Sequence, residues 1–368
     1  MLSGVESFVV LSEVENVNCH SDQSGARLGS ALARREIYLF KKWIPRQARD
    51  DIIDIILSMF LHTYTPQPIL FKLGPVKVYW YGFLIVIGIL IAFFISQWLL
   101  KKYKLMIGEV LKDVNLIDLS VYLLIGGLIG ARVFHIIAEW NYYFLHPLDV
   151  FKIWNGGLWI YGAIYGGFAG LLIYSKRKNF PKKKISFLLD LLAPGIIFAQ
   201  AIGRWGNYFN QELYGLPTKV FIGLPIEFVN RVSNFSEFSY FHPVFFYESI
   251  WCLAVGLILI WMHFYRLRNT PPYPPTPTRR AGLIKGGGED GHCLSSVRGE
   301  SFYSYGNIFL WYIFLYSFGR ALIEFIRIDT VPLIFGIRST QVVAILFMLL
   351  AGILIFKYEK NKHTFNNT

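Results

Sequence analysis

The sequence predicts an all-α integral membrane protein, a bundle of seven transmembrane helices with a re-entrant or extracytoplasmic segment after the fourth span. Three observations support this prediction. The chain of 368 residues is 54% hydrophobic and only 16% charged, whereas soluble domains are about 45–50% apolar and about 25% charged. Its apolar residues form long continuous runs, and its Lys and Arg residues are distributed unequally between them. An ordinary soluble enzyme and a largely disordered chain are therefore excluded.

A helix needs about 20 apolar residues to cross a bilayer core of about 30 Å. Seven stretches qualify, with boundaries at residues 78–100, 115–137, 157–174, 185–205, 243–265, 304–326 and 333–356. Their apolar residues run continuously rather than alternating, which favours helices over a β-barrel. The third stretch is short and rich in glycine. Because small residues let helices approach closely in lipid, we expect this helix to be buried in the bundle.

The charges between the spans predict the orientation. Nineteen Lys and Arg residues lie in the segments 101–114, 175–184, 266–303 and 357–368. Only five lie in the alternating segments 138–156, 206–242 and 327–338. Since the side rich in Lys and Arg is usually cytoplasmic, we expect a cytoplasmic carboxyl terminus and an extracytoplasmic amino terminus. These basic cytoplasmic loops account for the net charge of +12. We therefore expect no nucleic-acid partner.

Composition divides the chain into four parts. Residues 1–58 are polar and have neither the apolar core nor the cleavage site of a signal peptide. Residues 269–303 contain PPYPPTP and GGGEDG, which are typical of a linker or disordered loop. We expect both to be additions to a core that consists of 59–268, with spans 1–5, and 304–368, with spans 6–7 and a basic tail. Translation that starts at Met59 is part of this expectation, and an intact mass that includes Met1–Ser58 would contradict it.

Charged residues inside membrane spans are rare and are candidates for function. Arg204 ends the fourth span and Arg320 lies in the sixth, each near the predicted extracytoplasmic end. Arginine holds phosphate through the planar fork of its guanidinium. Two arginines at headgroup depth therefore indicate a phospholipid headgroup as ligand, and Arg132 in the second span is a candidate for a third.

A structural role is the competing interpretation for the other charged residues. Asp190, Glu324 and Arg327 could simply lock helices together through ion pairs. Because Arg320, Glu324 and Arg327 are spaced i, i+4, i+7, they share one helical face, and Arg320 is expected to pair with Glu324.

Several uncharged or titratable residues also have two interpretations. His135 and His242 are more often structural hydrogen-bond partners than bases, and Tyr81 fits an interfacial aromatic. The three cysteines, Cys19, Cys252 and Cys293, are scattered, so neither a disulfide framework nor a zinc site is supported.

One run of residues is specific enough to indicate a family. GRWGNYFNQELYG at 203–215 resembles the defining motif of the prolipoprotein diacylglyceryl transferases. Five further stretches resemble that family's motifs in order and position: LGPVKVYWYG (73–82), GARVFHI (130–136), NGGLWIYGAIYGG (155–167), HPVFFYE (242–248) and YSFGRALIEFIR (316–327). The resemblance covers about 60–268 and 303–358. The family has seven spans with the amino terminus outside, which agrees with the topology predicted from the charges.

The resemblance implies a reaction and its partners. A diacylglyceryl group would pass from phosphatidylglycerol to the cysteine thiol in the lipobox of a preprolipoprotein signal peptide, forming a thioether and releasing glycerol phosphate. The location would be the bacterial cytoplasmic (inner) membrane, with the lipid bilayer as the surroundings. No metal and no soluble cofactor is implied.

The resemblance also assigns residues to this chemistry. Arg204 and Arg320 match the family's essential arginines, which would meet the charge that develops on the leaving phosphate, and Glu324 would orient the second of them. With Tyr161 these form the expected catalytic set. The other matched positions are expected to bind substrate: Tyr81, Arg132, Asn207, Asn210, Glu212, Gly215, His242, Tyr247 and Glu248.

The third span departs from the family pattern. Well-studied members carry a histidine there that has been assigned as a base, and this chain has Tyr161. An unperturbed tyrosine has a pKa of about 10 and is a poor base at neutral pH. Either Tyr161 positions the lipid by hydrogen bonding, or another group takes the thiol proton, with His242, Glu212 and Glu324 as candidates.

Four other functions compete with this interpretation. An inactive paralogue would keep the fold and lack the chemistry. Another phospholipid-headgroup transferase would also use arginines, but many such enzymes bind metal through clustered Asp residues, and no such cluster is present in the spans. A phospholipid-binding transporter would be expected to show two related halves, and no internal repeat is evident. A lipoprotein-binding scaffold would not need the arginines.

Overall fold

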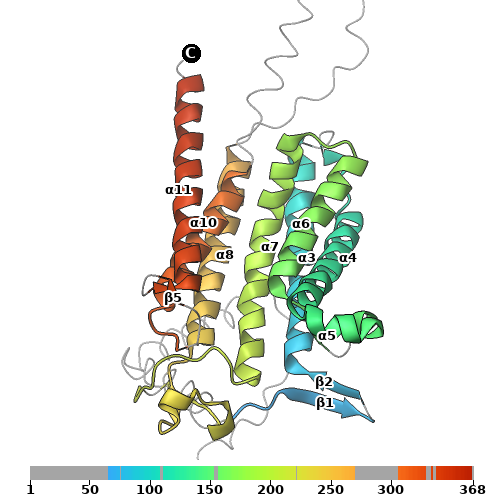
Figure 1. Ribbon diagram of the computed structural model, residues 1–368. Coiled ribbons are helices and arrows are strands. Elements are labelled where there is room, and N and C mark those ends of the chain that lie inside the picture. The colour runs from blue at the N-terminus through green and yellow to red at the C-terminus, as the bar shows by residue number, and fades with distance from the viewer. Residues whose placement is uncertain are drawn as a thin grey trace, which may run out of the picture. The chain divides into compact units, whose positions relative to one another are not determined.

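The structure is a computed structural model that describes residues 65–74, 76–107, 111–152, 156–220, 222–269, 306–328, 333–334 and 337–366 (Figure 1). These residues belong to one compact unit, Phe60–Thr368. The expectations for residues 1–58, for a start at Met59 and for the insert beyond Asn269 lie outside the described residues.

Helices dominate the described part of the chain, as predicted. Seven of them overlap the seven predicted spans in order: α3 (Trp80–Ile107), α4 (Leu116–Ala138), α6 (Ile160–Arg177), α7 (Lys182–Phe209), α8 (Val244–Arg268), α10 (Asn307–Ile323) and α11 (Ser339–Asn366). Two short helices follow α4, namely α5 (Trp140–Leu145) and the 3₁₀ turn η2 (Pro147–Phe151).

Among the described residues, five helices are long and apolar enough to cross a membrane: α3, α4, α7, α8 and α11. The third predicted span corresponds to α6, which contains four glycines and ends in Lys176 and Arg177. The sixth corresponds to α10, which has only 17 residues. The five apolar helices indicate a multi-pass membrane protein.

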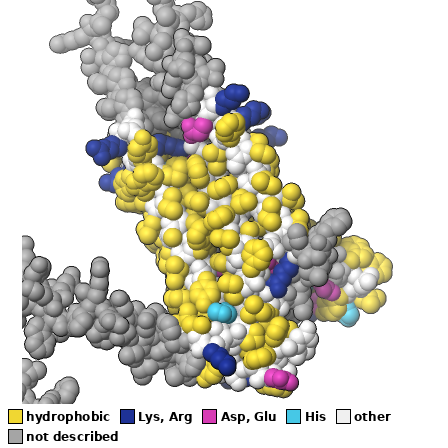
Figure 2. All heavy atoms as spheres, turned by 90° about the vertical axis from the view of Figure 1, so that its left-hand side faces the viewer, with side chains coloured by type: hydrophobic (Ala, Val, Ile, Leu, Met, Phe, Trp, Pro, Cys, Tyr) yellow, Lys and Arg dark blue, Asp and Glu magenta, His cyan; other side chains and the backbone are white. Residues whose placement is uncertain are grey.

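Hydrophobic side chains cover the outside of the helices. Figure 2 shows one face of the molecule, on which these side chains fill the middle and Lys and Arg side chains gather toward the upper end. Many large apolar residues of α4 and α6 are more than 40% exposed, among them Ile125 and Ile164. Because such surface is unfavourable in water, it fits contact with lipid.

Glycines bring α4 and α6 into direct backbone contact. A Cβ atom added at Gly130 would overlap the carbonyl oxygen of Gly162, and one added at Gly166 would overlap that of Gly126. The predicted close approach of the glycine-rich helix is therefore present. Its predicted burial in the bundle is wrong, because only the glycine face is covered and side chains such as Tyr165 are 62% exposed.

The remaining helices pack in sequence, α3 on α7, α7 on α8, α8 on α10 and α10 on α11 (Figure 1). Asp190, with 0% exposure, joins three of them. Its carboxylate lies 2.8 Å from Nη1 of Arg266 on α8 and accepts hydrogen bonds from the backbone N–H groups of Gly306 and Phe309 at the start of α10. The structural interpretation of Asp190 as a helix lock is confirmed.

Short antiparallel pairs lie outside the helices. Strand β1 (Ile69–Leu73) pairs with β2 (Val76–Tyr79), β3 (Leu224–Pro225) with β4 (Tyr240–Phe241), and β5 (Leu333–Ile334) with β6 (Ile337–Arg338). The segment after α7 also contains the 3₁₀ turns η4 (Phe228–Asn230) and η5 (Ser233–Phe235).

This segment after α7 forms a packed cap with its own apolar cluster, in which Tyr208, Phe241 and Phe245 are fully buried. A side-chain hydrogen bond from Gln211 to the carbonyl of Pro66, 3.1 Å long, ties the cap to the start of the described chain. The cap therefore holds the residues of the 203–215 motif in a fixed place.

Candidate functional site: a partly buried arginine cluster

Three arginine side chains converge on the carboxylate of Glu248. This residue lies in the second turn of α8 and is 2% exposed. Nε of Arg204, near the end of α7, lies 2.7 Å from Oε2 of Glu248, and Nη1 of Arg327 lies 3.5 Å from Oε1. Nη1 of Arg320, on α10, donates to the same Oε1. A single buried carboxylate thus connects α7, α8 and the end of α10.

A second buried carboxylate, Glu324, holds the cluster on its other side. Nη2 of Arg320 donates to its Oε2 at 3.2 Å, so the predicted pairing of these two residues is confirmed. The hydroxyl of Thr340 donates to Oε1 at 2.7 Å, and Nη1 of Arg338 donates to the Glu324 carbonyl at 2.8 Å. Since Thr340 belongs to α11, Glu324 fixes Arg320 relative to the last helix.

The cluster contains more positive than negative charge. In the described part of the chain, four arginines contact two glutamates, which leaves an excess of two positive formal charges. Buried charges are costly unless they are paired. The excess therefore favours an anionic ligand, and guanidinium groups hold phosphate or carboxylate oxygens through paired hydrogen bonds.

The free volume beside the cluster is small. A cavity of about 10 Å³ is lined by Glu248, Cys252, Tyr316 and Arg320, among others. This is about the space of one water molecule. Tyr316 also accepts a 3.3 Å hydrogen bond from Nη2 of Arg204. A phosphate group can bind between the arginines only if these side chains move and Glu248 gives up part of its pairing.

The polar residues of the 203–215 motif form a second group at the end of α7. Nδ2 of Asn207 lies 3.4 Å from one carboxylate oxygen of Glu212, and Nδ2 of Asn210 lies 3.3 Å from the other. Asn207 is buried and Glu212 is exposed. The motif therefore presents an exposed carboxylate that two amides orient.

Gly215 ties this motif to the arginine cluster. Its N–H donates to the carbonyl of His242 at 2.9 Å, and it forms an isolated β-bridge with Arg327. A Cβ atom at this position would lie 2.8 Å from the carbonyl oxygen of Ile326, which is too close for any other residue without movement. Glycine is needed here because two backbones meet.

His242 and Tyr247 form a pair beside this bridge. Nδ1 of His242 lies 3.1 Å from the Tyr247 hydroxyl. Burial lowers the pKa of His242 from its ordinary value of 6.5, so its imidazole is neutral at pH 7 and can accept a proton.

Tyr81 packs against the last turns of α7. It follows the first residue of α3 and is 40% exposed. A Cβ atom at Gly206 would lie 2.6 Å from its ring, so Tyr81 packs on the α7 backbone two residues after Arg204. This close contact explains a glycine at position 206.

Two predicted site residues, Arg132 and Tyr161, do not contact the arginine cluster. Arg132 donates to the carbonyls of Val150 at 2.9 Å and Gly156 at 2.8 Å, and its interactions with described residues all lie in the loop after α4 and with Tyr143. Tyr161 is 57% exposed at the start of α6 and has no side-chain hydrogen bond to the described residues. The structure does not bring either residue into contact with the arginine cluster.

Sequence reasoning did not assign Arg338, Thr340 and Tyr316 to the site. Tyr316 precedes Arg320 by four residues, so helical spacing could have placed it on the same face. Arg338 and Thr340 lie too far along the chain from Glu324 for helical spacing to place them beside it. No group of three or more His, Cys, Asp or Glu side chains suited to a metal ion occurs among the described residues.

The fold and the site together define a class of protein. It is a multi-pass membrane protein in which a partly buried, positively charged arginine cluster lies beside a packed cap. The chain belongs to the prolipoprotein diacylglyceryl transferase family, whose model matches residues 68–274 and 293–357.

Curated relatives cover most of the chain. It is 36% identical to a phosphatidylglycerol–prolipoprotein diacylglyceryl transferase of Synechocystis. The match spans 305 residues, which cover 81% of this chain and 92% of the relative. The chain is 37% identical over 286 residues to the transferase of Trichormus variabilis, 78% of this chain and 87% of the relative. The transferase of Staphylococcus aureus is 34% identical over 299 residues, 81% of this chain and 90% of the relative.

Proposed function

We propose that this protein transfers the diacylglyceryl group of phosphatidylglycerol to the lipobox cysteine of a preprolipoprotein. The observation that carries the proposal is the excess positive charge of the partly buried arginine cluster, in which Arg204, Arg320 and Arg327 belong to the family's motifs. In the reaction, the cysteine sulfur forms a bond to the glyceryl carbon of the lipid. The bond from that carbon to the phosphate oxygen breaks, glycerol phosphate leaves with the electron pair, and the thiol proton passes to an acceptor.

The arginines support departure of the phosphate. Arg204 and Arg320 both contact Glu248, and a phosphodiester can replace this carboxylate as their partner because both ligands present paired anionic oxygens. Negative charge grows on the leaving phosphate in the transition state. Fixed guanidinium groups in a water-poor site stabilise that charge more than they stabilise the bound lipid.

Glu324 is a positioning residue in this scheme. It is 2% exposed, and its carboxylate accepts hydrogen bonds from Arg320 and Thr340. It therefore holds the guanidinium of Arg320 in place. These contacts make it a weaker candidate for the proton acceptor. Exposed Glu212 and neutral His242 are the stronger candidates, because both can meet a substrate that enters beside the cap.

The other expected residues have supporting roles. We propose that the exposed hydroxyl of Tyr161 orients the lipid rather than removing the proton. Asn207 and Asn210 orient Glu212. Arg132 supports the loop after α4.

The proposal includes a topology. α6 and α10 cross the membrane together with the five longer apolar helices, giving seven spans in the bacterial inner membrane. The amino terminus and the cap face outward, and the carboxyl terminus is cytoplasmic. The gathering of Lys and Arg at the ends of α6, α8 and α11 supports this orientation.

A direct transfer assay tests the function. Membranes that contain the full chain are incubated with phosphatidylglycerol and a lipobox peptide, and the peptide mass is measured. We expect a diacylglyceryl adduct for the natural sequence, none for Arg204→Ala, and a normal amount for the control Arg268→Ala, which removes an exposed arginine at the other end of α8. An adduct of normal amount with Arg204→Ala would refute the role of the cluster, and no adduct from folded protein would favour an inactive paralogue or a transporter.

A further inference from the structure

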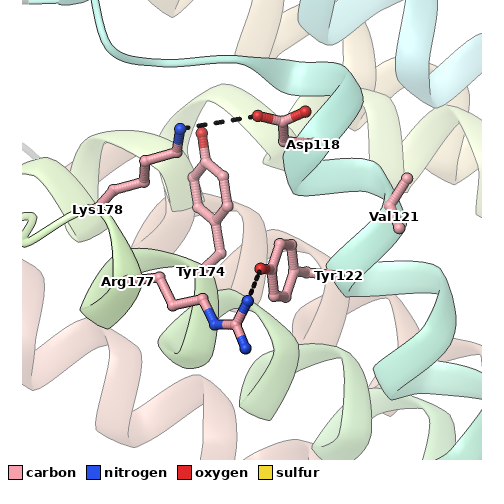
Figure 3. A pocket seen from close by; sticks show the side chains of 6 residues that line it. All are labelled: Asp118, Val121, Tyr122, Tyr174, Arg177 and Lys178. Carbon is pink, nitrogen blue, oxygen red and sulfur yellow. Dashed lines mark hydrogen bonds and ion pairs between the residues drawn. The ribbon is translucent and has the colours of Figure 1, made fainter.

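A second basic site lies between the start of α4 and the end of α6. It is a cavity of about 440 Å³, lined by Asp118, Val121, Tyr122, Tyr174, Arg177 and Lys178 (Figure 3). After α6 the chain turns into α7 at Lys182, and Arg204 lies 22 residues further along that helix. This separation corresponds to roughly 33 Å at 1.5 Å per residue. The cavity is therefore near the opposite membrane surface from the arginine cluster.

The two cations of this cavity are incompletely paired. Nη1 of Arg177 donates to the Tyr122 hydroxyl at 3.1 Å, and its guanidinium lies over the Tyr122 ring, 5.8 Å from the centroid. These are its side-chain interactions with described residues, so most of its five N–H donors have no protein acceptor there. Lys178 lies 3.8 Å from Asp118, and both side chains are more than 40% exposed. Such an exposed ion pair contributes little to stability. The cavity lining thus contains two cations and a single carboxylate.

The wall of the cavity is rigid. Tyr174 is fully buried, and its hydroxyl accepts from the N–H of Asn115 and donates to the Asn115 carbonyl, both at 3.1 Å. The side chain of Asn115 in turn caps α4 by accepting from the N–H of Ile117 at 2.9 Å. A ligand would therefore meet a preformed surface, which lowers the entropy cost of binding.

Apolar surface continues from the cavity along both helices. Leu124 and Ile125 follow Val121 at i+3 and i+4 on α4, and Ile173 precedes Arg177 at i−4 on α6, so each pair shares a face. All four apolar side chains are 48–55% exposed. In a multi-pass membrane protein such surface contacts acyl chains, and the two cations lie at its edge, where lipid headgroups are found.

We propose that this cavity binds the headgroup phosphate of an anionic phospholipid, whose acyl chains lie against the exposed apolar faces of α4 and α6. Charge selects an anion, and the adjoining apolar surface selects a lipid over a free phosphate ion. The bound lipid is a structural partner rather than the substrate, because it lies at the opposite membrane surface from the arginine cluster. The inference does not depend on the proposed transfer reaction.

Native mass spectrometry of the full chain in detergent tests this site. The protein is titrated with dioleoyl phosphatidylglycerol or with zwitterionic dioleoyl phosphatidylcholine, and the bound lipids are counted. We expect the double variant Arg177→Gln/Lys178→Gln to hold one phosphatidylglycerol fewer, with at least about tenfold weaker binding, as follows from losing a hydrogen bond to a charged group. The matched control Lys182→Gln/Lys183→Gln removes the same charge from exposed residues nearby and should retain every lipid.

A second variant removes the space without changing the charge. Val121→Trp adds a large side chain to the cavity lining and should also lower the count of bound phosphatidylglycerol by one. Any one of three results would overturn the proposal. These are equal lipid counts in the natural protein and both variants, equal retention of phosphatidylcholine at the site, and displacement of the lipid by millimolar inorganic phosphate. The transfer assay reads the other site, so its failure in the natural protein would refute the proposed reaction and leave this lipid count unchanged.

Discussion

Replacing Arg320 by lysine tests whether the fork of its guanidinium matters for the reaction. Arg320 uses two different nitrogens, Nη1 toward Glu248 and Nη2 toward Glu324, the latter at 3.2 Å. A lysine ammonium keeps the positive charge but is a single point, so it cannot bridge two carboxylates and then present a planar pair of donors to a phosphate. We therefore expect Arg320→Lys to fold and to transfer poorly.

The magnitude follows from what the variant loses. Removing one fixed donor to a developing oxyanion lowers the rate about 10²–10³-fold, or about 2.7–4 kcal/mol. The stability loss should be smaller than the roughly 3–5 kcal/mol for an uncompensated buried charge. Glu248 keeps Arg204 and Arg327 as partners, and Glu324 keeps Thr340.

The assay is the transfer rate in liposomes of phosphatidylglycerol with a lipobox peptide, expressed as kcat/KM. The matched control is Arg338→Lys. Arg338 uses one nitrogen, Nη1, which donates to the Glu324 carbonyl at 2.8 Å and lies 3.9 Å from its Oε1, so lysine can replace it, and we expect a loss below about tenfold. An Arg320→Lys rate close to the natural one, or an equal loss in both variants, would refute the reasoning from fork geometry.

Two further predictions concern the fold. Gly166→Ala should lower the free energy of unfolding by about 1–3 kcal/mol, as an overpacked contact does, because the new methyl overlaps the Gly126 carbonyl. Gly167→Ala is the control, since its Cβ would lie 3.8 Å from the nearest atom, the carbonyl oxygen of Leu123; equal thermal unfolding of the two variants would contradict the close helix contact. Burial makes the pKa of His242 lower in the folded protein than in the unfolded chain. The neutral imidazole therefore contributes fully to stability above about pH 6.5, the pKa of the unfolded chain, and this contribution is lost as the pH falls through the pKa of the folded state. His242→Gln should therefore lose less thermal stability than the natural protein between pH 7.5 and 5, and identical slopes would disprove it.

The arginine cluster is paired within the protein. In the proposed reaction, Glu248 occupies the place that the substrate phosphate would take, and little free volume remains beside it. Partly buried guanidinium groups without an anion would be costly. The internal carboxylate therefore stabilises the arginines. Under the proposed function the substrate competes with it, which favours ligands that offer paired oxygens to several arginines at once.

The sequence predicted the positions of seven described helices, five of which are long and apolar enough to cross a membrane, and the pairing of Arg320 with Glu324. It also predicted that the glycine-rich helix approaches a neighbour closely. It was wrong about the burial of that helix, because glycine spacing indicates one close contact and does not indicate what covers the other faces. The sequence also did not show where α10 ends, because the predicted sixth span covers 304–326 and α10 has only 17 residues, Asn307–Ile323.

Local chemistry is what the sequence by itself determined: which segments are apolar enough for lipid, which end of the helices is basic, and which motif holds Arg204. These properties depend on neighbouring residues and on helical periodicity, both of which can be read along the chain. Tertiary structure alone decided that Glu248 would join Arg204, Arg320 and Arg327, while Arg132 would bind loop carbonyls. Contacts between distant segments depend on how whole helices pack, and a buried charge takes whichever partner that packing brings within reach.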